Sequence, residues 1–187
     1  MWKSYLSSQA KKFVKQHKIF DVVIYGSAVK GKDEPRDIDI MLIFLDRNLK
    51  ERLDIVQNFK QVSKKINKLD VKSMNLKDIF DNKFLARQGV LLEGRSLINE
   101  VTLADRLGFK SYSIFSYNLK NLNHNEKTKF TYALIGRKED GMIKKVEGEP
   151  LGKGAIIVPI ENSIIFEEFL NQWNVKYNKR NALLSLL

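Results

Sequence analysis

Two aspartates alternate with isoleucines in the run RDIDIMLIF, residues 36–44. Side chains along a β-strand point to opposite faces in turn, so a strand here places Asp37 and Asp39 on the same face. The isoleucines between and after them then point into a core. Two neighbouring carboxylates repel each other, and a divalent cation removes that cost. Mg²⁺ prefers oxygen ligands and keeps several waters, so carboxylates and substrate phosphate oxygens suit it. The alternation therefore predicts a metal site on one face of a strand.

A Gly-Ser turn lies just upstream of this run. Gly26 and Ser27 follow the apolar segment DVVIY and precede SAVKG, residues 27–31, which can form one or two helical turns. At a strand-to-helix junction the free backbone N–H groups and the helix dipole favour phosphate, and glycine lets a phosphate approach the main chain closely. The turn therefore predicts a phosphate site beside the metal site.

The order of these residues resembles the signature of the DNA polymerase β-like nucleotidyltransferase superfamily. That signature is an apolar residue, Gly-Ser, nine intervening residues and Asp-x-Asp flanked by apolar residues, and Tyr25–Ser27 with Asp37–Ile40 fits it. The family also has a third acidic residue on a later strand, and Asp70 in LDVKSMNL takes that place. The resemblance covers roughly residues 1–100. The commonest family variant has Ser before the first aspartate, where this chain has Arg36.

The resemblance implies the transfer of a nucleoside monophosphate from an NTP, with ATP as the first choice, to an acceptor hydroxyl with release of pyrophosphate. Two Mg²⁺ ions, with Mn²⁺ as an alternative, would sit between the carboxylates and the triphosphate. Asp37 and Asp39 would bridge both ions, and Asp70 would complete the ion that activates the acceptor hydroxyl. The nucleotide-binding residues that the resemblance implies are Gly26, Ser27, Lys30 and Arg36.

Other interpretations of the chain stay open at this stage. One is a regulator without catalysis that binds nucleic acid through a basic C-terminal domain. Another, suggested by the habits of the family, is a small transferase that acts on a partner protein, as in some toxin–antitoxin modules. The acceptor is not identified by the sequence and is RNA, a protein hydroxyl or a small molecule such as an aminoglycoside. A homodimer is a further open alternative.

Charge and composition narrow the class of partner. The chain of 187 residues has a formal net charge of +11, shared by both halves, which favours anionic partners such as nucleic acid or nucleotides. It has no cysteine, so disulfides and thiolate metal sites are excluded. No stretch approaches the ~20 apolar residues of a membrane span, and the N-terminus lacks an apolar signal-peptide core. We expect a cytoplasmic protein without membrane contact.

The apolar pattern predicts an α/β (α+β) fold with a small mixed β-sheet backed by helices on one face. We expect a catalytic domain over residues 1–104, built from helix, strand, turn, strand, helix and strand. The predicted elements are a helix at 2–17, strands at 20–25 and 38–45, a helix at about 49–67, a strand carrying Asp70 and a short helix around 76–88.

Residues 105–187 predict a small α+β domain that binds the acceptor or nucleic acid, or mediates dimerisation. We expect an aromatic strand, a helix ending at Gly136, two strands around a glycine-rich turn, a helix from about 161 and a final strand. A helix-turn-helix centred on Gly108 is an alternative for its start. Cations and aromatic rings that could form a nucleic-acid surface are Arg137, Lys144, Lys145, Lys153, Lys179, Arg180, Tyr112, Tyr117 and Tyr177.

Overall fold

The computed structural model describes residues 2–29, 37–66 and 68–185. The chain divides into two compact units between Leu107 and Gly108, whereas the sequence places the boundary between residues 104 and 105. Within the described residues, each unit contains a four-stranded sheet and its own apolar core. The mixed class of helices and sheets expected from the sequence is confirmed.

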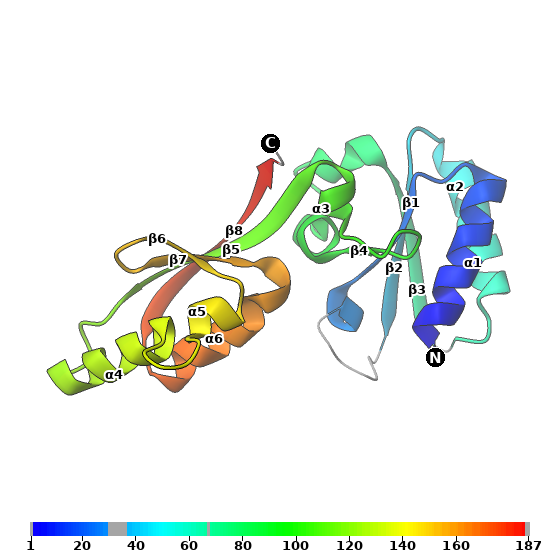
Figure 1. Ribbon diagram of the computed structural model, residues 1–187. Helices are drawn as coiled ribbons and strands as arrows, with labels where there is room; N and C mark the ends of the chain where they lie inside the picture. The colour runs from blue at the N-terminus through cyan, green and yellow to red at the C-terminus, as the bar shows by residue number, and fades with distance from the viewer. Residues whose placement is uncertain (1, 30–36, 67, 186–187) are drawn as a thin grey trace. The chain divides into compact units, whose positions relative to one another are not determined.

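The sheet of the first unit is mixed, as the sequence predicts. Its strands are β1 (Asp21–Tyr25), β2 (Ile38–Phe44), β3 (Leu69–Asn75) and β4 (Arg95–Ser96). They lie in the order β3-β2-β1-β4 (Figure 1). β1 is antiparallel to both of its neighbours, and β2 is parallel to β3. The parallel β2–β3 pair requires a crossover, which the helix between these two strands supplies.

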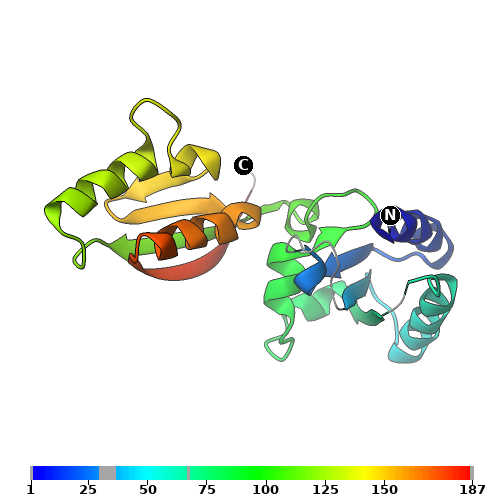
Figure 2. The same ribbon diagram turned by 90° about the horizontal axis from the view of Figure 1, so that it is seen from below.

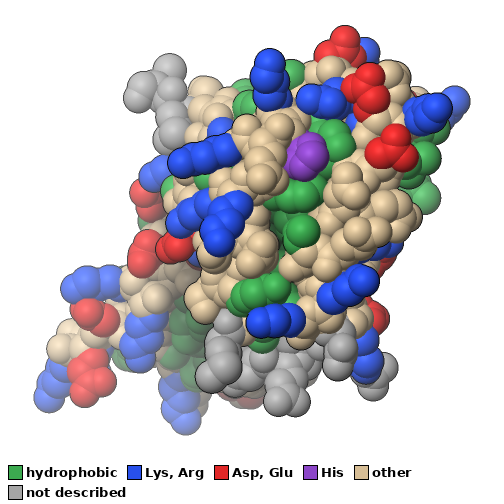
Figure 3. Space-filling view, turned by 90° about the vertical axis from the view of Figure 1, so that its right-hand side faces the viewer, with side chains coloured by type: hydrophobic (Ala, Val, Ile, Leu, Met, Phe, Trp, Pro, Cys, Tyr) green, Lys and Arg blue, Asp and Glu red, His purple; other side chains and the backbone are tan. Residues whose placement is uncertain are grey.

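Two helices, α1 (Trp2–His17) and α2 (Leu49–Val62), cover one face of this sheet (Figure 1). Apolar residues at helical spacing form their buried sides, and the Phe13 and Phe59 rings meet edge to face with centroids 5.1 Å apart. The helix expected over 49–67 ends at Val62, because the next residues form tighter backbone turns. Figure 3 shows Lys and Arg side chains spread among apolar atoms over this side, without a single basic cluster.

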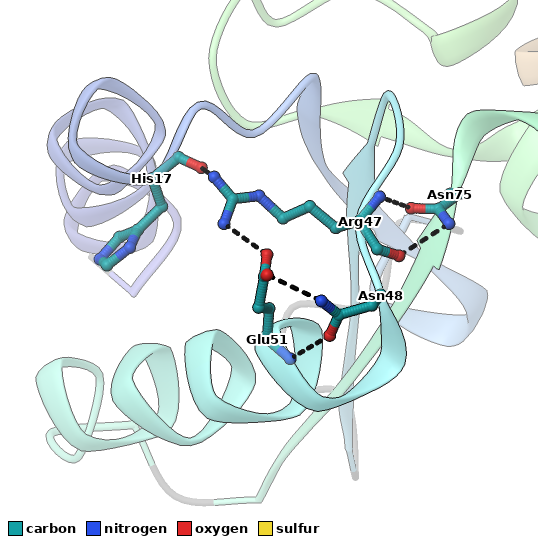
Figure 4. A network of polar contacts seen from close by, with 5 residues as sticks. All are labelled: His17, Arg47, Asn48, Glu51 and Asn75. Carbon is teal, nitrogen blue, oxygen red and sulfur yellow. Dashed lines mark hydrogen bonds and ion pairs between the residues drawn. The ribbon is translucent and has the colours of Figure 1, made fainter.

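A network of polar contacts fixes the start of α2 (Figure 4). The Asn48 side chain accepts a hydrogen bond from the Glu51 backbone N–H at 3.0 Å, which is a typical helix N-cap and is worth about 1 kcal/mol. Arg47 pairs with Glu51 at 3.2 Å and donates to the backbone carbonyl of His17 at 3.0 Å. The Asn75 side chain holds the backbone of Arg47 from the end of β3. The network therefore joins the end of α1, the start of α2 and the end of β3.

The segment from 76 to 107 adds the edge strand β4 to the sheet, and its helical turns pack on the other face (Figure 1), which the sequence does not predict. Its elements are the 3₁₀ turn η2 (Leu76–Phe80), the π-helical turn η3 (Gln88–Glu93), β4 and α3 (Leu103–Arg106). The single short helix expected around 76–88 is wrong. The Asp81 side chain accepts a hydrogen bond from the Lys83 N–H at 2.9 Å, and such local bonding competes with helix formation.

The second unit has the order strand, helices, two strands, helix, strand. Its strands are β5 (Phe109–Asn118), β6 (Glu149–Gly152), β7 (Ala155–Pro159) and β8 (Lys176–Ser185). They form an antiparallel sheet in the order β6-β7-β5-β8. β5 pairs with β8 along its whole length, which excludes the helix-turn-helix alternative for this segment.

Three helices pack into one aromatic-rich core in this unit, and they lie on one side of the sheet in Figures 1 and 2. They are α4 (His124–Ile135), α5 (Met142–Lys145) and α6 (Ser163–Gln172), joined to β7 by the 3₁₀ turn η4 (Ile160–Asn162). The predicted helix end at Gly136 is confirmed, with a φ of 95° there. None of the helices in the described ranges is both long and apolar enough to cross a bilayer.

Candidate active site

The alternating aspartates lie where β2 begins. Asp39 pairs in register with Asp70 on β3 and with Tyr25 on β1. Residues directly opposite each other on neighbouring strands project to the same face, so the two carboxylates lie side by side. The isoleucines on either side of Asp39 are buried, whereas Asp39 is half-buried. Asp37 precedes the first residue of β2 and is exposed. The predicted alternation is confirmed for Asp39 and its flanking isoleucines, whereas Asp37 lies outside the strand.

Gly26 brings the backbone of the Gly-Ser turn against this pair. Its φ is 73°, a left-handed conformation that glycine adopts without a steric cost. A Cβ added at Gly26 would lie 2.6 Å from the Oδ2 atom of Asp39. Only a residue without a side chain therefore fits between the turn and the carboxylate. Ser27 follows in the 3₁₀ turn η1 (Gly26–Val29) and is half-buried.

The surroundings of Asp39 disfavour its charged form. Burial raises the pKa of the Asp39 carboxyl, and the negative charge of Asp70 raises that pKa further. The charge of Asp37 adds a smaller effect in the same direction, while Lys72 acts in the opposite direction. A cation placed between the carboxylates would relieve this repulsion.

Lys72 is a cation at this site that the sequence analysis misses. It lies two residues after Asp70 on β3, so both side chains leave the same face of the sheet. Its Nζ atom is 3.0 Å from the Oδ2 atom of Asp70, and the two side chains are 58% and 45% exposed. This contact raises the pKa of the Lys72 ammonium. The alternation in the run LDVKS, with Asp and Lys two apart, is the signal that could have found it.

Comparison with known proteins gives a family for this part of the chain. Residues 8–98 match the family model described as polymerase beta, nucleotidyltransferase. These residues form a nucleotidyltransferase-family domain. A crystal structure of a Sulfolobus solfataricus protein, provisionally described as a nucleotidyltransferase, is 22% identical to the chain; the match covers 41% of this chain and 73% of that one, with a TM-score of 0.30. No curated protein matches the chain.

Tyr25 is a second residue of the nucleotidyltransferase domain whose side chain the sequence analysis does not single out. It is 6% exposed, and its hydroxyl oxygen is buried without a hydrogen-bond partner among the described residues. Burial raises the pKa of this hydroxyl, and the charges of Asp39 and Asp70 raise it further against the effect of Lys72. Tyr25 therefore places a neutral, protonated hydroxyl beside the carboxylate pair.

The structure brings together some of the predicted site residues and does not place others. Asp39, Asp70 and Gly26 meet at the start of β2, with Ser27 next to Gly26. Lys30 and Arg36 lie outside the described residues. Within the ranges that the structure describes, no three His, Asp or Glu side chains are close enough together to hold a metal ion. Asp39 and Asp70 are therefore the two predicted carboxylates that the described residues bring together, and Asp37 lies just before the strand.

The donors of these carboxylates fit a hard divalent cation. Carboxylate oxygens are the ligands that Mg²⁺ prefers, and such sites usually combine one or two carboxylates with waters and phosphates. Burial and the charge of Asp70 raise the pKa of Asp39 even with Lys72 close to it, so a bound cation would favour the ionised carboxylates. Asp39 and Asp70, with Asp37 at the edge of the strand, are the residues that would hold the ion.

A third carboxylate on the same face, Asp21, makes its polar contacts within the protein, although its Oδ2 atom receives no hydrogen bond from the described residues. It is fully buried, and its Oδ1 atom accepts hydrogen bonds from the Ser96 hydroxyl at 2.8 Å and the Val22 N–H at 2.7 Å. Its Oδ2 atom lies 3.3 Å from a guanidinium nitrogen of Arg106 in α3. Asp21 therefore links β1 to β4 and α3 and has a structural role.

Proposed function

We propose that the nucleotidyltransferase domain moves a nucleoside monophosphate from an NTP, ATP in the first instance, to an acceptor hydroxyl with release of pyrophosphate. The observation that carries this proposal is the in-register pair of Asp39 and Asp70 beside Gly26, in a domain of this family. Neither a half-buried carboxylate pair nor a left-handed glycine against it is required by the fold alone. Together they provide acidic ligands next to an approachable main chain.

In the proposed reaction, the acceptor oxygen bonds to the α-phosphorus while the bond from that phosphorus to the β-phosphate oxygen breaks. Asp39 and Asp70, with Asp37 just before β2, would hold Mg²⁺, or Mn²⁺ in its place. Two bound ions would lower the pKa of the acceptor hydroxyl and neutralise charge on the attacking and leaving oxygens. The acceptor proton passes to solvent, and pyrophosphate leaves as the second product.

The remaining residues bind and orient the nucleotide in this proposal. Gly26 keeps the turn free of a side chain, so that the β- and γ-phosphates can approach the N–H groups at residues 26–28. The Ser27 hydroxyl donates to a phosphate oxygen, and Lys30 and Arg36 add positive charge. The Tyr25 hydroxyl, which is protonated at neutral pH as for any tyrosine, is available as a hydrogen-bond donor beside the carboxylates.

The test is label transfer from each α-³²P nucleoside triphosphate, with Mg²⁺, to RNA, protein and small-molecule fractions. Asp39→Asn is expected to lower transfer by more than about 100-fold, above the loss typical of a residue that only supports a metal ligand. The matched control is Asp46→Asn. Asp46 is an exposed aspartate after β2 that pairs with Lys77 at 3.2 Å. We expect it to transfer like the wild type.

Each outcome has a clear meaning. Near wild-type transfer by Asp39→Asn would show that the carboxylate pair is not the active site. Transfer to the protein fraction would support the toxin–antitoxin type of activity and exclude a nucleic-acid acceptor. Absence of transfer, with duplex binding that is steeply salt-dependent and equal in wild type and Asp39→Asn, would support the regulator without catalysis.

A further inference from the structure

The sheet of the second unit has one face that its own helices do not cover. Helices α4, α5 and α6 lie on one side of this sheet (Figure 2). They pack into a single cluster with Phe115 of β5 and with Ile156 and Val158 of β7. Side chains alternate along a strand, so the residues between these point away from the helices. Among the described residues of this unit, no helix packs on that second face, which we call the open face.

Neighbouring residues of β8 show the difference between the two faces. Lys179 pairs with Phe115 across the strands and reaches α6, where its Nζ atom lies 2.8 Å from an oxygen of Glu167. The Tyr177 hydroxyl donates to the same carboxylate at 2.8 Å. Arg180 is the next residue, so it points to the open face and is exposed. The helix face thus neutralises its lysine within the unit.

Charges on the open face have one sign along the two long strands. Lys110 of β5 and Lys176 and Arg180 of β8 are exposed, and within the described ranges none of them forms an ion pair. Glu149, on β6 at the far edge of the sheet, is the one acidic residue in the four strands. The β5–β8 half of this face is therefore complementary to an anionic ligand.

Flat and polar groups lie between these cations. Tyr112 of β5 is half-buried and is paired with the small residues Ala182 and Pro159 on either side. Arg180 is its diagonal neighbour, within roughly 7 Å on the same face. Asn178 adds an exposed amide between Lys176 and Arg180, which are about 13 Å apart along an extended strand. A ring, a guanidinium and an amide therefore share a strip with spaced positive charges.

We propose that the open face of β5 and β8 binds single-stranded nucleic acid, which is the acceptor of the transferase. The binding of nucleic acid is argued from the second unit alone. Its role as the acceptor rests on the proposed function. Single strands are bound by spaced cations that contact phosphates and by aromatic or guanidinium planes on which bases stack. An acidic peptide would use the cations but would leave the aromatic ring without a stacking partner.

The experiment is fluorescence anisotropy with a labelled 20-nucleotide RNA of mixed sequence and the full chain, in EDTA and without NTP. Lys176→Ala/Arg180→Ala should bind about 10-fold more weakly. The slope of log K against log salt should fall by about 1.4, because each phosphate that is no longer neutralised lowers it by about 0.7. Tyr112→Leu, which keeps an apolar side chain, should bind about 10-fold more weakly with an unchanged slope.

The matched control is Lys127→Ala/Lys129→Ala, which removes the same charge from exposed positions of α4. It should bind like the wild type, and so should Asp39→Asn, because binding does not involve the first unit. Equal weakening in both double variants, no RNA binding, or equal binding of duplex RNA would overturn the proposal. Intact RNA binding with no label transfer would instead refute the proposed function, and transfer to protein would refute the assignment of the acceptor.

Discussion

Asp21 and Asp39 lie on the same face of the first sheet, at opposite ends of the paired strands β1 and β2. Asp21 is fully buried but receives two hydrogen bonds and the charge of Arg106. Asp39 is less buried, yet its neighbours across the strands are another carboxylate and a tyrosine. The comparison shows that burial alone does not mark an active-site acid. The neighbours differ instead, because Asp21 faces a guanidinium within the fold whereas Asp39 lies beside a second carboxylate, Asp70.

The largest expected effect comes from removing the cation that pairs with Asp21. Arg106→Met leaves Asp21 buried without its cation, and we expect a loss of about 3 kcal/mol in the free energy of unfolding at pH 7. Burial already raises the pKa of Asp21 above its usual value in the folded chain. A carboxyl whose pKa is raised in the folded state makes its full contribution to the free energy of unfolding below its unfolded pKa of about 4. That contribution is lost as the pH rises through the folded pKa.

Urea unfolding of Arg106→Met at pH 4 and at pH 7 measures this effect. The loss relative to wild type should be smaller at pH 4, where Asp21 is more protonated. Label transfer per folded molecule should stay unchanged, because Arg106 contacts Asp21, which lies at the opposite end of β1 from the residue paired with Asp39. An equal loss of stability at both pH values would show that Asp21 carries no charge that depends on Arg106.

A smaller effect is expected at the glycine that touches Asp39. Gly26→Ala forces a left-handed backbone on alanine, at a cost of about 1–2 kcal/mol, and pushes a Cβ into the Asp39 carboxylate. Gly108→Ala is the matched control, since Gly108 has a φ of 83° and no atom within 4 Å of an added Cβ. Thermal unfolding should show a loss for both variants, whereas label transfer should fall only for Gly26→Ala. A similar fall in both would mean that strain, not contact with Asp39, controls activity.

Removing the negative charge of Asp39 should stabilise the folded protein. The folded-state pKa of Asp39 is raised by burial and by Asp70, so its ionisation destabilises the fold as pH rises. Asp39→Asn should therefore have a higher free energy of unfolding than wild type at pH 7, by less than about 1 kcal/mol. Its urea midpoint should be slightly higher. The difference should vanish below pH 4. A variant that is less stable than wild type at pH 7 would show that Asp39 is already satisfied within the protein.

The smallest expected effect concerns the ion pair of Lys72 with Asp70. Exposed ion pairs of this kind contribute about 0.2–1 kcal/mol. A metal ion that binds Asp70 must break the pair, which lowers the affinity for the metal by up to roughly 5-fold. Lys72→Met should therefore bind Mn²⁺ more tightly, by up to that factor, in a calorimetric titration. Lys77→Met, which removes an exposed lysine paired with Asp46, should leave the affinity unchanged. Weaker binding by Lys72→Met would mean that the lysine supports the metal site instead of competing with it.

Local sequence patterns predicted much of this site. Strand alternation was enough to place Asp39 on a face opposite its buried isoleucines, and the same alternation on β3 would have placed Lys72 beside Asp70. The contact between Asp21 and Arg106 was not predictable in this way, because it joins residues 85 positions apart through the packing of α3. The conformation of the 76–93 segment depends on Asx-type hydrogen bonding and on burial against the sheet, which periodicity does not report.

In the second unit, element types followed from the apolar pattern, but strand order and the open face did not. The sequence grouped Tyr117, Tyr177 and Lys179 with Tyr112 and Arg180 as one candidate surface. The structure places the first three on the helix face, with Lys179 and Tyr177 bound to Glu167, and leaves the last two on the open face. Register between β5 and β8 decides this separation, and it is set by tertiary pairing of residues far apart in the chain.

Calorimetric titration of Mn²⁺ into wild type, Asp39→Asn and Asp46→Asn, each with ATP, tests the central claim most directly. The claim is that the Asp39–Asp70 end of the sheet depends on a cation, unlike the Asp21 end. We predict saturable Mn²⁺ binding beyond that of ATP alone for wild type and Asp46→Asn, and only the binding of ATP alone for Asp39→Asn. Equal binding by Asp39→Asn and wild type would contradict the account, because the ion would then be held elsewhere in the chain or by ATP alone.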